Sequence, residues 1–465
     1  MKIGFDNQKY LEMQSQHIRD RIAQFDNKLY LEFGGKLFDD YHASRVLPGF
    51  EPDSKLQMLL QLKDQAEIVI VISAEDIENN KVRDDYGITY DMDVLRLIDE
   101  FQAVGLYVGS VCLTKYAGQA SAELFRKKLA ELGIKSYRHY KIVGYPSDIA
   151  HIVSDEGSQL YHEYKRGVKA GYAKFETFPI WNLPLKHPVN LAYEAATADL
   201  NDVNMIDPFH LEAYGETTVN YNRDIEIFPV VATMFELIAG SSPYKSPTDM
   251  GVNMAGNCII DDQVCRDASA QEIIRRYYRC LCDRKRYGQS KDDKNKLELL
   301  LRQAGVSMED RLVAKKALAR EEETGHPAMA IELADGTIVT GKTGDLLGAS
   351  AAAILNALKV LAGIPHEVQL VSKEAIEPIQ RLKIQYLGSH NPRLHTDEIL
   401  IALSTTAAQD EKAKLAIEQL SKLKNCQAHS TVLLSSVDEQ LLKKIGVQLT
   451  CSPKYEEEDR KYHRR

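Results

Sequence analysis

Residues 68–72 read Ile-Val-Ile-Val-Ile, and this run decides the fold class. Every side chain in it is β-branched, which favours a strand, and the lack of polar alternation is typical of a parallel strand covered on both faces. A second buried strand is predicted at 106–113 (LYVGSVCL), and an amphipathic helix at 92–103 lies between the two. Strand, helix and strand in this order predict a right-handed β-α-β crossover and a doubly wound α/β domain.

The same alternation extends to both sides of this unit. It predicts a helix capped by Asp6 or Asn7, a strand at 30–34, a helix at 120–132 and a strand at 140–143. The alternation then breaks, because the next helix begins at about Ser158 with no strand before it. A strand and a turn are therefore missing at the junction Gly157-Ser158. The sequence leaves open whether they are deleted from the protein or omitted from this record of it.

Changes in composition divide the chain into three predicted domains. These are a doubly wound, mostly parallel α/β domain at 1–240, a highly charged helical domain at 241–325, and a smaller α/β domain at 326–465. A long, turn-rich loop is expected at 240–256. In the last domain, strands are predicted near 329–333, 337–340, 367–371, 398–404, 430–435 and 447–451, and helices near 349–362, 373–385, 409–424 and 437–444.

Composition restricts the partners and the compartment. A formal net charge of −9 argues against a dedicated nucleic-acid binder. No apolar run is long enough to span a membrane, and charges by residue 6 argue against a secretory signal. Seven cysteines in 465 residues suit a reducing compartment. The protein is therefore expected to be cytoplasmic, with no membrane partner.

Three stretches resemble a known family, and the resemblance covers nearly the whole chain. FGGKLFDDYHASRVLPGF (33–50), SPTDMGVNMAG (246–256) and DGTIVTGKTGDLLGASAAA (335–353) are similar to the uncharacterised bacterial family called domain of unknown function 1846. The family name implies no reaction.

The resemblance also implies a strand and a glycine-rich loop, Gly-Pro-Gly-Ser-Gly-Lys, directly before SQLYHE (158–163). That loop is similar to the phosphate loop of nucleotide-binding proteins. No residue of this chain matches it, because it would fall at the junction where the alternation also lacks a strand. A true deletion weighs against nucleotide binding, whereas an omission makes nucleotide binding the leading expectation.

Ligands of doubly wound sheets bind beyond the carboxyl ends of the strands. There, glycine amides and lysine ammonium groups can hold an anion. The phosphate-binding candidates at these ends are Gly34, Gly35, Lys36 and Lys115. The carboxylate candidates for Mg²⁺ are Glu75, Asp76 and Asp207. A glycine pair after a strand is also the signature of a simple tight turn.

The stretch GTIVTGKT (336–343) matches the phosphate-loop pattern letter for letter. Its context favours a hairpin instead, because Asp335-Gly336 is a turn signal and 337–339 reads as the returning strand. The start of the helix that follows, with Lys342 and Thr343 nearby, could still hold a phosphate or carboxylate. Alternatively, Ala351–Ala353 are small because that helix packs closely on the sheet.

Two further groups are candidates for metal or anion sites. The loop GSHNPRLHTDE (388–398) supplies His390, Arg393, His395 and Asp397, as a metal site, an anion site or a plain surface loop. Cys280 and Cys282 point to opposite sides of a helix, so a zinc site with Cys258 and Cys265 is not favoured.

Two functional hypotheses remain, and the sequence does not decide whether the protein is an enzyme. The leading one is a protein that binds a nucleotide or a small phosphorylated metabolite, as a phosphotransferase does; its cofactors would be ATP and magnesium. The alternative is a non-catalytic binding or assembly protein whose loops fold against a partner subunit, as in a homo-oligomer.

Overall fold

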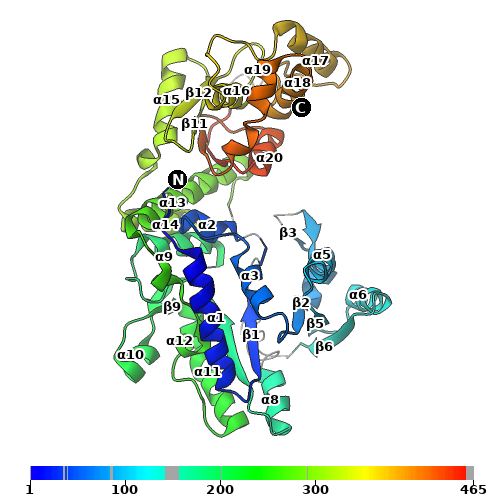
Figure 1. The fold of residues 1–465 in the computed structure, drawn as a ribbon, viewed down its shortest axis with the longest axis vertical. Helices are drawn as coiled ribbons and strands as arrows, with labels where there is room; N and C mark the ends of the chain where they lie inside the picture. Colours follow the sequence, from blue (N-terminus) through cyan, green and yellow to red (C-terminus); the bar gives the residue numbers. More distant parts are fainter. Residues whose placement is uncertain are drawn as a thin grey trace. The chain divides into compact units, whose positions relative to one another are not determined.

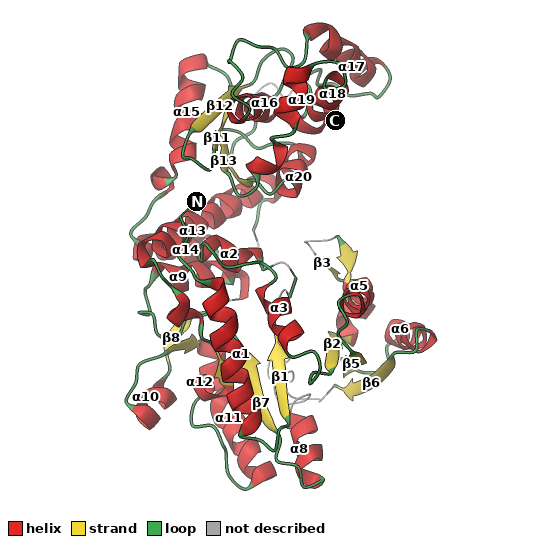
Figure 2. Cartoon of the chain, in the orientation of Figure 1, coloured by secondary structure: helices red, strands yellow, loops and turns green. Residues whose placement is uncertain are grey.

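The computed structural model describes residues 2–34, 37–38, 40–83, 87–141, 157–200, 202–290 and 292–456 (Figures 1 and 2). These residues form two compact units of mixed α/β structure. The N-terminal unit comprises Ile3–Asn190 and Asp202–Cys265, and the C-terminal unit comprises Met1–Lys2, Leu191–Asn201 and Arg266–Arg465. The predicted α/β class is confirmed.

The first sheet of the N-terminal unit has the order β1-β7-β10, and both pairs are parallel. Its strands are β1 (Leu29–Phe33), β7 (Gly171–Phe175) and β10 (Gly251–Val252). The helices in this part of the unit are α1 (Asn7–Ala23), α8 (Gly157–Lys165) and α11 (Asn222–Ala239). The Asp6 side chain caps α1, as expected. The predicted loop at 240–256 is corrected, because it contains β10, a strand too short to show periodicity.

The second sheet has the order β2-β5-β6, again all parallel. Its strands are β2 (Ile68–Ser73), β5 (Val108–Tyr116) and β6 (Lys135–Tyr140). Helices α4 (Ala74–Glu78), α5 (Tyr90–Ala103) and α6 (Ala120–Glu131) belong to the same part of the chain. The parallel strand at 68–72 is confirmed, but the strands are divided between two sheets. The strand predicted at 140–143 ends at Tyr140, and residues 142–156 lie outside the described residues.

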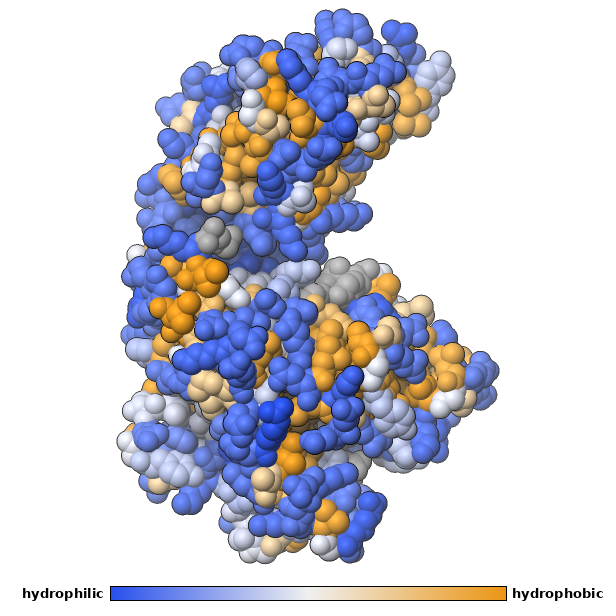
Figure 3. Space-filling model, in the orientation of Figure 1, coloured by the Kyte–Doolittle hydropathy of each residue, from blue (hydrophilic) through white to orange (hydrophobic). Residues whose placement is uncertain are grey.

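Among the described residues, only one face of β2 is covered. Ile70 and Ile72 are buried in a hydrophobic cluster, whereas Val69 and Val71 are each 49% exposed. The expectation that both faces are covered is therefore wrong for this strand. Figure 3 shows hydrophobic side chains at the surface over the region of β2, α5 and α6.

The remaining elements of the N-terminal unit are short. They are α2 (Tyr41–Val46), α3 (Ser54–Gln61), the antiparallel pairs β3 (Val82–Arg83) with β4 (Ile88–Thr89) and β8 (Asn204–Ile206) with β9 (Val219–Tyr221), α10 (Pro208–Tyr214), α12 (Pro247–Met250) and a 3-10 turn at Ala255–Cys258. Helix α9 (Pro188–Ala196) and the 3-10 turn Ala198–Leu200 come between β7 and β8.

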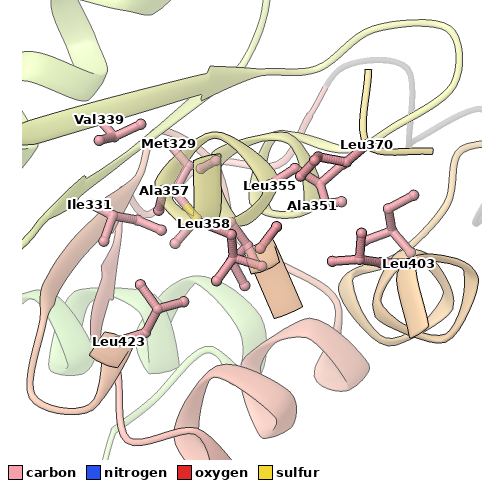
Figure 4. Packing of buried hydrophobic residues seen from close by; sticks show 14 of the residues in the cluster. Met329, Ile331, Val339, Ala351, Leu355, Ala357, Leu358, Leu370, Leu403 and Leu423 are labelled. Atoms are coloured by element: carbon pink, nitrogen blue, oxygen red, sulfur yellow. The ribbon is translucent and has the colours of Figure 1, made fainter. Parts of the chain in front are cut away.

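The C-terminal unit contains a four-stranded sheet of order β12-β11-β13-β14. Its strands are β11 (Ala328–Glu332), β12 (Ile338–Lys342), β13 (Gln427–Ser430) and β14 (Gln448–Cys451). Its helices are α13 (Asp262–Tyr287), α14 (Lys294–Ala304), α15 (Leu312–Thr324), α16 (Ala349–Leu361), α17 (Lys373–Gln385), α18 (Thr396–Thr406), α19 (Glu411–Ile417) and α20 (Ser436–Lys444). Met329 and Ile331 of β11 pack with Leu355 and Leu358 of α16 in one core cluster (Figure 4).

Three strands predicted in this unit are corrected. Residues 398–404 form part of helix α18, because Ile399, Ala402 and Leu403 recur at helical spacing on its buried face. Residues 367–371 form no strand and lead into the capped start of α17. The strand predicted at 430–435 is β13, which lies mostly before that range. The helix predicted at 409–424 is α19 followed by a 3-10 turn at Leu420–Leu423.

Arg311 is completely buried in the C-terminal unit. Its guanidinium donates hydrogen bonds to uncharged oxygens of Thr450 (2.8 Å), Gln427 (3.0 Å), Gln271 (3.3 Å), Ala428 (3.1 Å) and Gln448 (3.0 Å). Burial lowers the pKa of Arg311 to about 10. The guanidinium thus stays charged at neutral pH and joins α13, β13 and β14.

None of the seven cysteines, all of which lie in the described residues, forms a disulfide bond, and only Cys112 on β5 is not buried. Burial raises the pKa of Cys258 to about 11 and the pKa of Cys265 to about 12. Across the described residues, no group of three His, Cys, Asp or Glu side chains is arranged to hold a metal ion. No helix in the same residues is long and apolar enough to cross a membrane.

Candidate functional site

The carboxyl edge of the β2-β5-β6 sheet contains an unusual backbone conformation. The pairing of β5 with β6 shifts register between Leu113 and Tyr116, and within this bulge Lys115 has a φ of 49°. The left-handed region costs an L-residue with a side chain about 1–2 kcal/mol. Strained residues of this kind persist where the surrounding structure holds them, and they concentrate at functional sites.

Charged side chains from all three strands meet at this edge, because parallel strands end on the same side of a sheet. Glu75 follows β2, Lys115 lies at the end of β5, and Lys141 follows β6. Lys141 Nζ lies 2.6 Å from Glu75 Oε1. The hydrogen bond from Lys141 lowers the pKa of Glu75, and the charge of Lys115 adds to this. The structure thus brings together two predicted residues and adds Lys141, which sequence reasoning missed.

A buried hydroxyl group lies next to the bulge. Thr114 is 1% exposed, and its Oγ1 has no hydrogen-bond partner among the described residues. Buried polar atoms are nearly always paired, so an unpaired hydroxyl indicates a place for a water molecule or a ligand. We call Glu75, Thr114, Lys115 and Lys141 the bulge site.

The other two magnesium candidates, Asp76 and Asp207, already have partners within the protein. Asp76 forms a 3.3 Å ion pair with Lys81 at the surface. Asp207 is completely buried at the start of α10. Its carboxylate accepts four hydrogen bonds: from the main-chain N–H groups of Phe209 and His210, and from the N–H and hydroxyl of Thr248.

The glycine-lysine candidate at the end of β1 is only partly described. Gly34 is exposed, and its carbonyl accepts a hydrogen bond from Lys55 Nζ at 3.4 Å. An added Cβ at Gly34 would meet no atom within 4 Å, so the position is spacious. Gly35 and Lys36 lie outside the described residues.

The hairpin interpretation of 336–343 is confirmed. Strands β11 and β12 pair antiparallel, with Gly336 in the turn at a φ of 88°. A Cβ added to Gly341 would lie 2.2 Å from the main-chain nitrogen of Ala353, so this glycine allows close packing of α16 on β12. Lys342 is exposed, and the buried Thr343 donates its main-chain N–H to the carbonyl of Pro327.

The loop 388–398 is held mostly by contacts within the C-terminal unit. His390 is exposed, and Arg393 pairs with Glu456 at 2.9 Å. His395 Nδ1 lies 2.9 Å from Asp438 Oδ2, and this contact raises the pKa of His395. Asp397 lies in the first turn of α18, the helix that replaces the expected strand.

A partly buried cluster of charges on the other sheet was not predicted. Lys174 on β7 lies 3.0 Å from Glu176 Oε1 and 2.6 Å from Asp224 Oδ2. Glu32 of β1 pairs with Lys174 in the sheet register and accepts a hydrogen bond from Tyr172. We call Glu32, Lys174, Glu176 and Asp224 the Lys174 cluster.

The Lys174 cluster contains three carboxyl groups and one lysine, so it cannot be neutral with all four ionised. Burial of Glu176, which is 5% exposed on its side chain, raises its pKa to about 7. The neighbouring carboxylates raise the pKa of Lys174, which therefore stays charged. Burial thus brings the pKa of Glu176 close to neutral pH.

Replacing Glu176 with glutamine is expected to change the pH dependence of stability. The pKa of Glu176 is higher in the folded state than its ordinary value of 4.5, so the folded state binds more protons between pH 4.5 and about 7. Wild-type stability should therefore fall as pH rises through this range, by up to about 3 kcal/mol from this group, and the variant should lose less. Urea unfolding at pH 5 and pH 8 measures the difference. The exposed Glu226→Gln on α11 is the control, and equal pH slopes in Glu176→Gln and wild type would contradict the expectation.

A simple pattern could have revealed this cluster. In GYAKFE (171–176), the lysine and the glutamate alternate with aromatic and small residues, so both point to one face of a strand. Burying charged side chains at alternate positions of a central strand is costly unless they are paired. Such a pattern in a sequence therefore indicates a cluster of paired charges.

Comparisons with known proteins cover nearly the whole chain. A family model described as domain of unknown function DUF1846, N-terminal, matches residues 3–157 and 158–305, and its C-terminal counterpart matches residues 309–461. A UPF0371 protein of Streptococcus equi subsp. equi (strain 4047) is 54% identical over 484 residues, which is 98% of each chain. A UPF0371 protein of Streptococcus thermophilus (strain CNRZ 1066) is 53% identical over 485 residues, with the same coverage.

These alignments are longer than the chain itself. An alignment of 484 positions against a chain of 465 residues leaves at least 19 positions of the relative with no counterpart. The N-terminal family match is interrupted between Gly157 and Ser158, the junction at which the strand-helix alternation lacks a strand.

Proposed function

We propose a function from the bulge site itself, since the chain belongs to the family described as domain of unknown function 1846, and that description names no reaction. The bulge site binds the phosphate group of a nucleotide or of a small phosphorylated metabolite. The observation that carries this proposal is the left-handed conformation of Lys115 in a bulge at the carboxyl edge of a parallel sheet.

The charges of the bulge site favour an anion. Two lysines face a single carboxylate, which leaves one positive charge at an edge where α/β proteins bind ligands. Thr114, the residue before Lys115, has a hydroxyl without a hydrogen-bond partner among the described residues, and a hydroxyl can donate to a phosphate oxygen. Phosphoryl transfer requires mainly such positioned cations, together with Mg²⁺ held by carboxylates. Glu75 of the bulge site and Asp76, which follows it in the first turn of α4, are the carboxylates that would hold Mg²⁺.

Replacing Lys115 with glycine tests the proposal without straining the backbone. Glycine adopts a positive φ freely, so the unliganded variant should be as stable as wild type or more stable. Loss of the ammonium group should weaken phosphate binding about tenfold or more, because a hydrogen bond to a charged group contributes about 1.5–3 kcal/mol. Thermal shift with ATP, GTP and inorganic phosphate, each with and without Mg²⁺, provides the measurement.

Two controls make the result specific to the bulge site. Lys135→Ala removes an exposed lysine at the opposite end of β6 and should keep the full ligand-induced shift. Lys115→Ala removes the ammonium group but retains the backbone strain. An undiminished ligand-induced thermal shift in Lys115→Gly would show that the phosphate does not bind at the bulge site. The absence of any shift in wild type would refute the proposal and favour the non-catalytic alternative.

A further inference from the structure

The segment that forms α6 and β6 is basic within an acidic chain. Residues 120–141 contain six lysine and arginine residues and two glutamates, whereas the whole chain has a formal net charge of −9. None of the six residues of β6 is buried. The net charge of the chain argues against a dedicated nucleic-acid binder, but it does not describe this local surface.

Two arginines of the segment share one carboxylate. Arg126 of α6 donates to Glu123 Oε1 at 3.0 Å, and Arg138 of β6 lies 3.5 Å from the same oxygen. Arg126 Nε–H also donates to Ser136 Oγ at 3.2 Å, which holds the guanidinium beside β6. One carboxylate cannot neutralise two guanidinium groups, so a positive charge remains here, where the side chain of Arg138 is 40% exposed.

An exposed aromatic ring lies next to these arginines. Tyr140 of β6 is 61% exposed, and its ring meets the buried ring of Tyr116 edge-on, with the centroids 5.4 Å apart. The guanidinium of Arg138 lies 5.5 Å from the centroid of the same Tyr116 ring. Contact with Tyr116 therefore holds the ring of Tyr140 in place beside a cation and leaves most of that ring open to solvent.

A third cation lies on the same side of α6. Lys127 is exposed and comes one helical turn after Glu123, the carboxylate that the two arginines share. We call Arg126, Lys127, Arg138 and Tyr140 the β6 surface. It combines three cations with one exposed ring, and this composition is complementary to a phosphate backbone that carries flat bases.

We propose that the β6 surface binds single-stranded RNA. A base stacks on the ring of Tyr140, and the three cations contact the phosphates on either side of that base. Duplexes keep their bases stacked inside, whereas RNA loops and ends offer unstacked bases to aromatic side chains and to arginine. The ring of Tyr140 thus selects a single strand, and the cations attract it. The proposal does not depend on a ligand at the bulge site.

Fluorescence anisotropy tests the stacking step on the full chain, with a labelled oligoadenylate of about twelve nucleotides as the probe. Tyr140→Ala should weaken binding about fivefold or more, because the stacking of one base contributes at least that much. Tyr140→Phe retains the ring and should bind as wild type does. Tyr137→Ala is the matched control, because Tyr137 is 57% exposed on the same strand but points to the opposite face of the sheet.

The salt dependence of binding tests the cations. The double variant Arg138→Gln, Lys127→Gln should lower the slope of log Kd against log salt by about 1.4, since each neutralised phosphate of a single strand contributes about 0.7. Lys63→Gln, at an exposed position after α3, should leave the slope unchanged.

Three results would overturn the proposal. The first is a wild-type protein that does not bind the oligoadenylate. The second is equal affinity for an RNA duplex or for polyglutamate, which would show a general attraction for anions or an acidic protein partner. The third is undiminished binding by Tyr140→Ala, which would show that no base stacks on this ring.

Discussion

Replacing Arg311 with leucine is expected to lower the free energy of unfolding of the C-terminal unit by about 4 kcal/mol. The guanidinium satisfies five oxygen atoms that belong to α13, β13 and β14. Leucine supplies no donor, so buried carbonyl and amide oxygens lose their partners, and each unpaired group costs about 1–3 kcal/mol. The losses are not additive, because the surrounding residues relax and admit water.

Urea unfolding followed by far-UV circular dichroism measures this effect, and two variants serve for comparison. Lys316→Ala removes an exposed cation from α15, the helix that follows Arg311, and should change stability by less than about 0.5 kcal/mol. Arg311→Lys retains the charge but has only three donors. Its stability should therefore lie between that of Arg311→Leu and that of Lys316→Ala. If leucine were tolerated as well as lysine, the hydrogen bonds would not be the source of the stability.

Replacing Asp207 with alanine is expected to cost about 3 kcal/mol, the second largest effect. The change removes the cap of α10, which typically contributes about 1 kcal/mol, and it leaves the buried Thr248 hydroxyl and N–H without their acceptor. Chemical denaturation of the variant, with and without added Mg²⁺, separates a structural role from metal binding.

The matched control for this variant is Glu212→Ala, an exposed carboxylate on the same helix α10. It should leave stability within about 0.5 kcal/mol of wild type. A wild-type protein that Mg²⁺ stabilises, beside an Asp207→Ala variant of normal stability that Mg²⁺ does not stabilise, would assign the carboxylate to a metal instead.

Sequence patterns predicted most of the fold where they were long or chemically unambiguous. The β-branched run at 68–72 is β2, and the turn signal Asp335-Gly336 joins β11 to β12. Short apolar runs were the failures. EILIALS (398–404) fits a buried strand and a buried helix face equally well, and it is the helix α18. Its capping box, in which Glu398 accepts the N–H of His395, was the readable signal that favoured the helix.

The candidate sites were predictable only in part, for different physical reasons. The rule that ligands bind at carboxyl ends placed Glu75 and Lys115 correctly at one edge of a sheet. The left-handed backbone of Lys115 leaves no trace in the sequence, because the surrounding structure, not the residue type, imposes it. The Lys174 cluster depends on contacts between β1, β7 and α11, which periodicity along a single strand does not reveal.

The distribution of the cysteines has a practical consequence. All seven lie in the described part of the chain, and six are buried, so Cys112 on β5 is the cysteine most open to solvent. It pairs in the sheet register with Val71 on one side and with Tyr137 on the other. A maleimide fluorophore or spin label should therefore attach at a single place in the folded wild-type chain. Spectroscopy at the centre of the β2-β5-β6 sheet then requires no engineered residue.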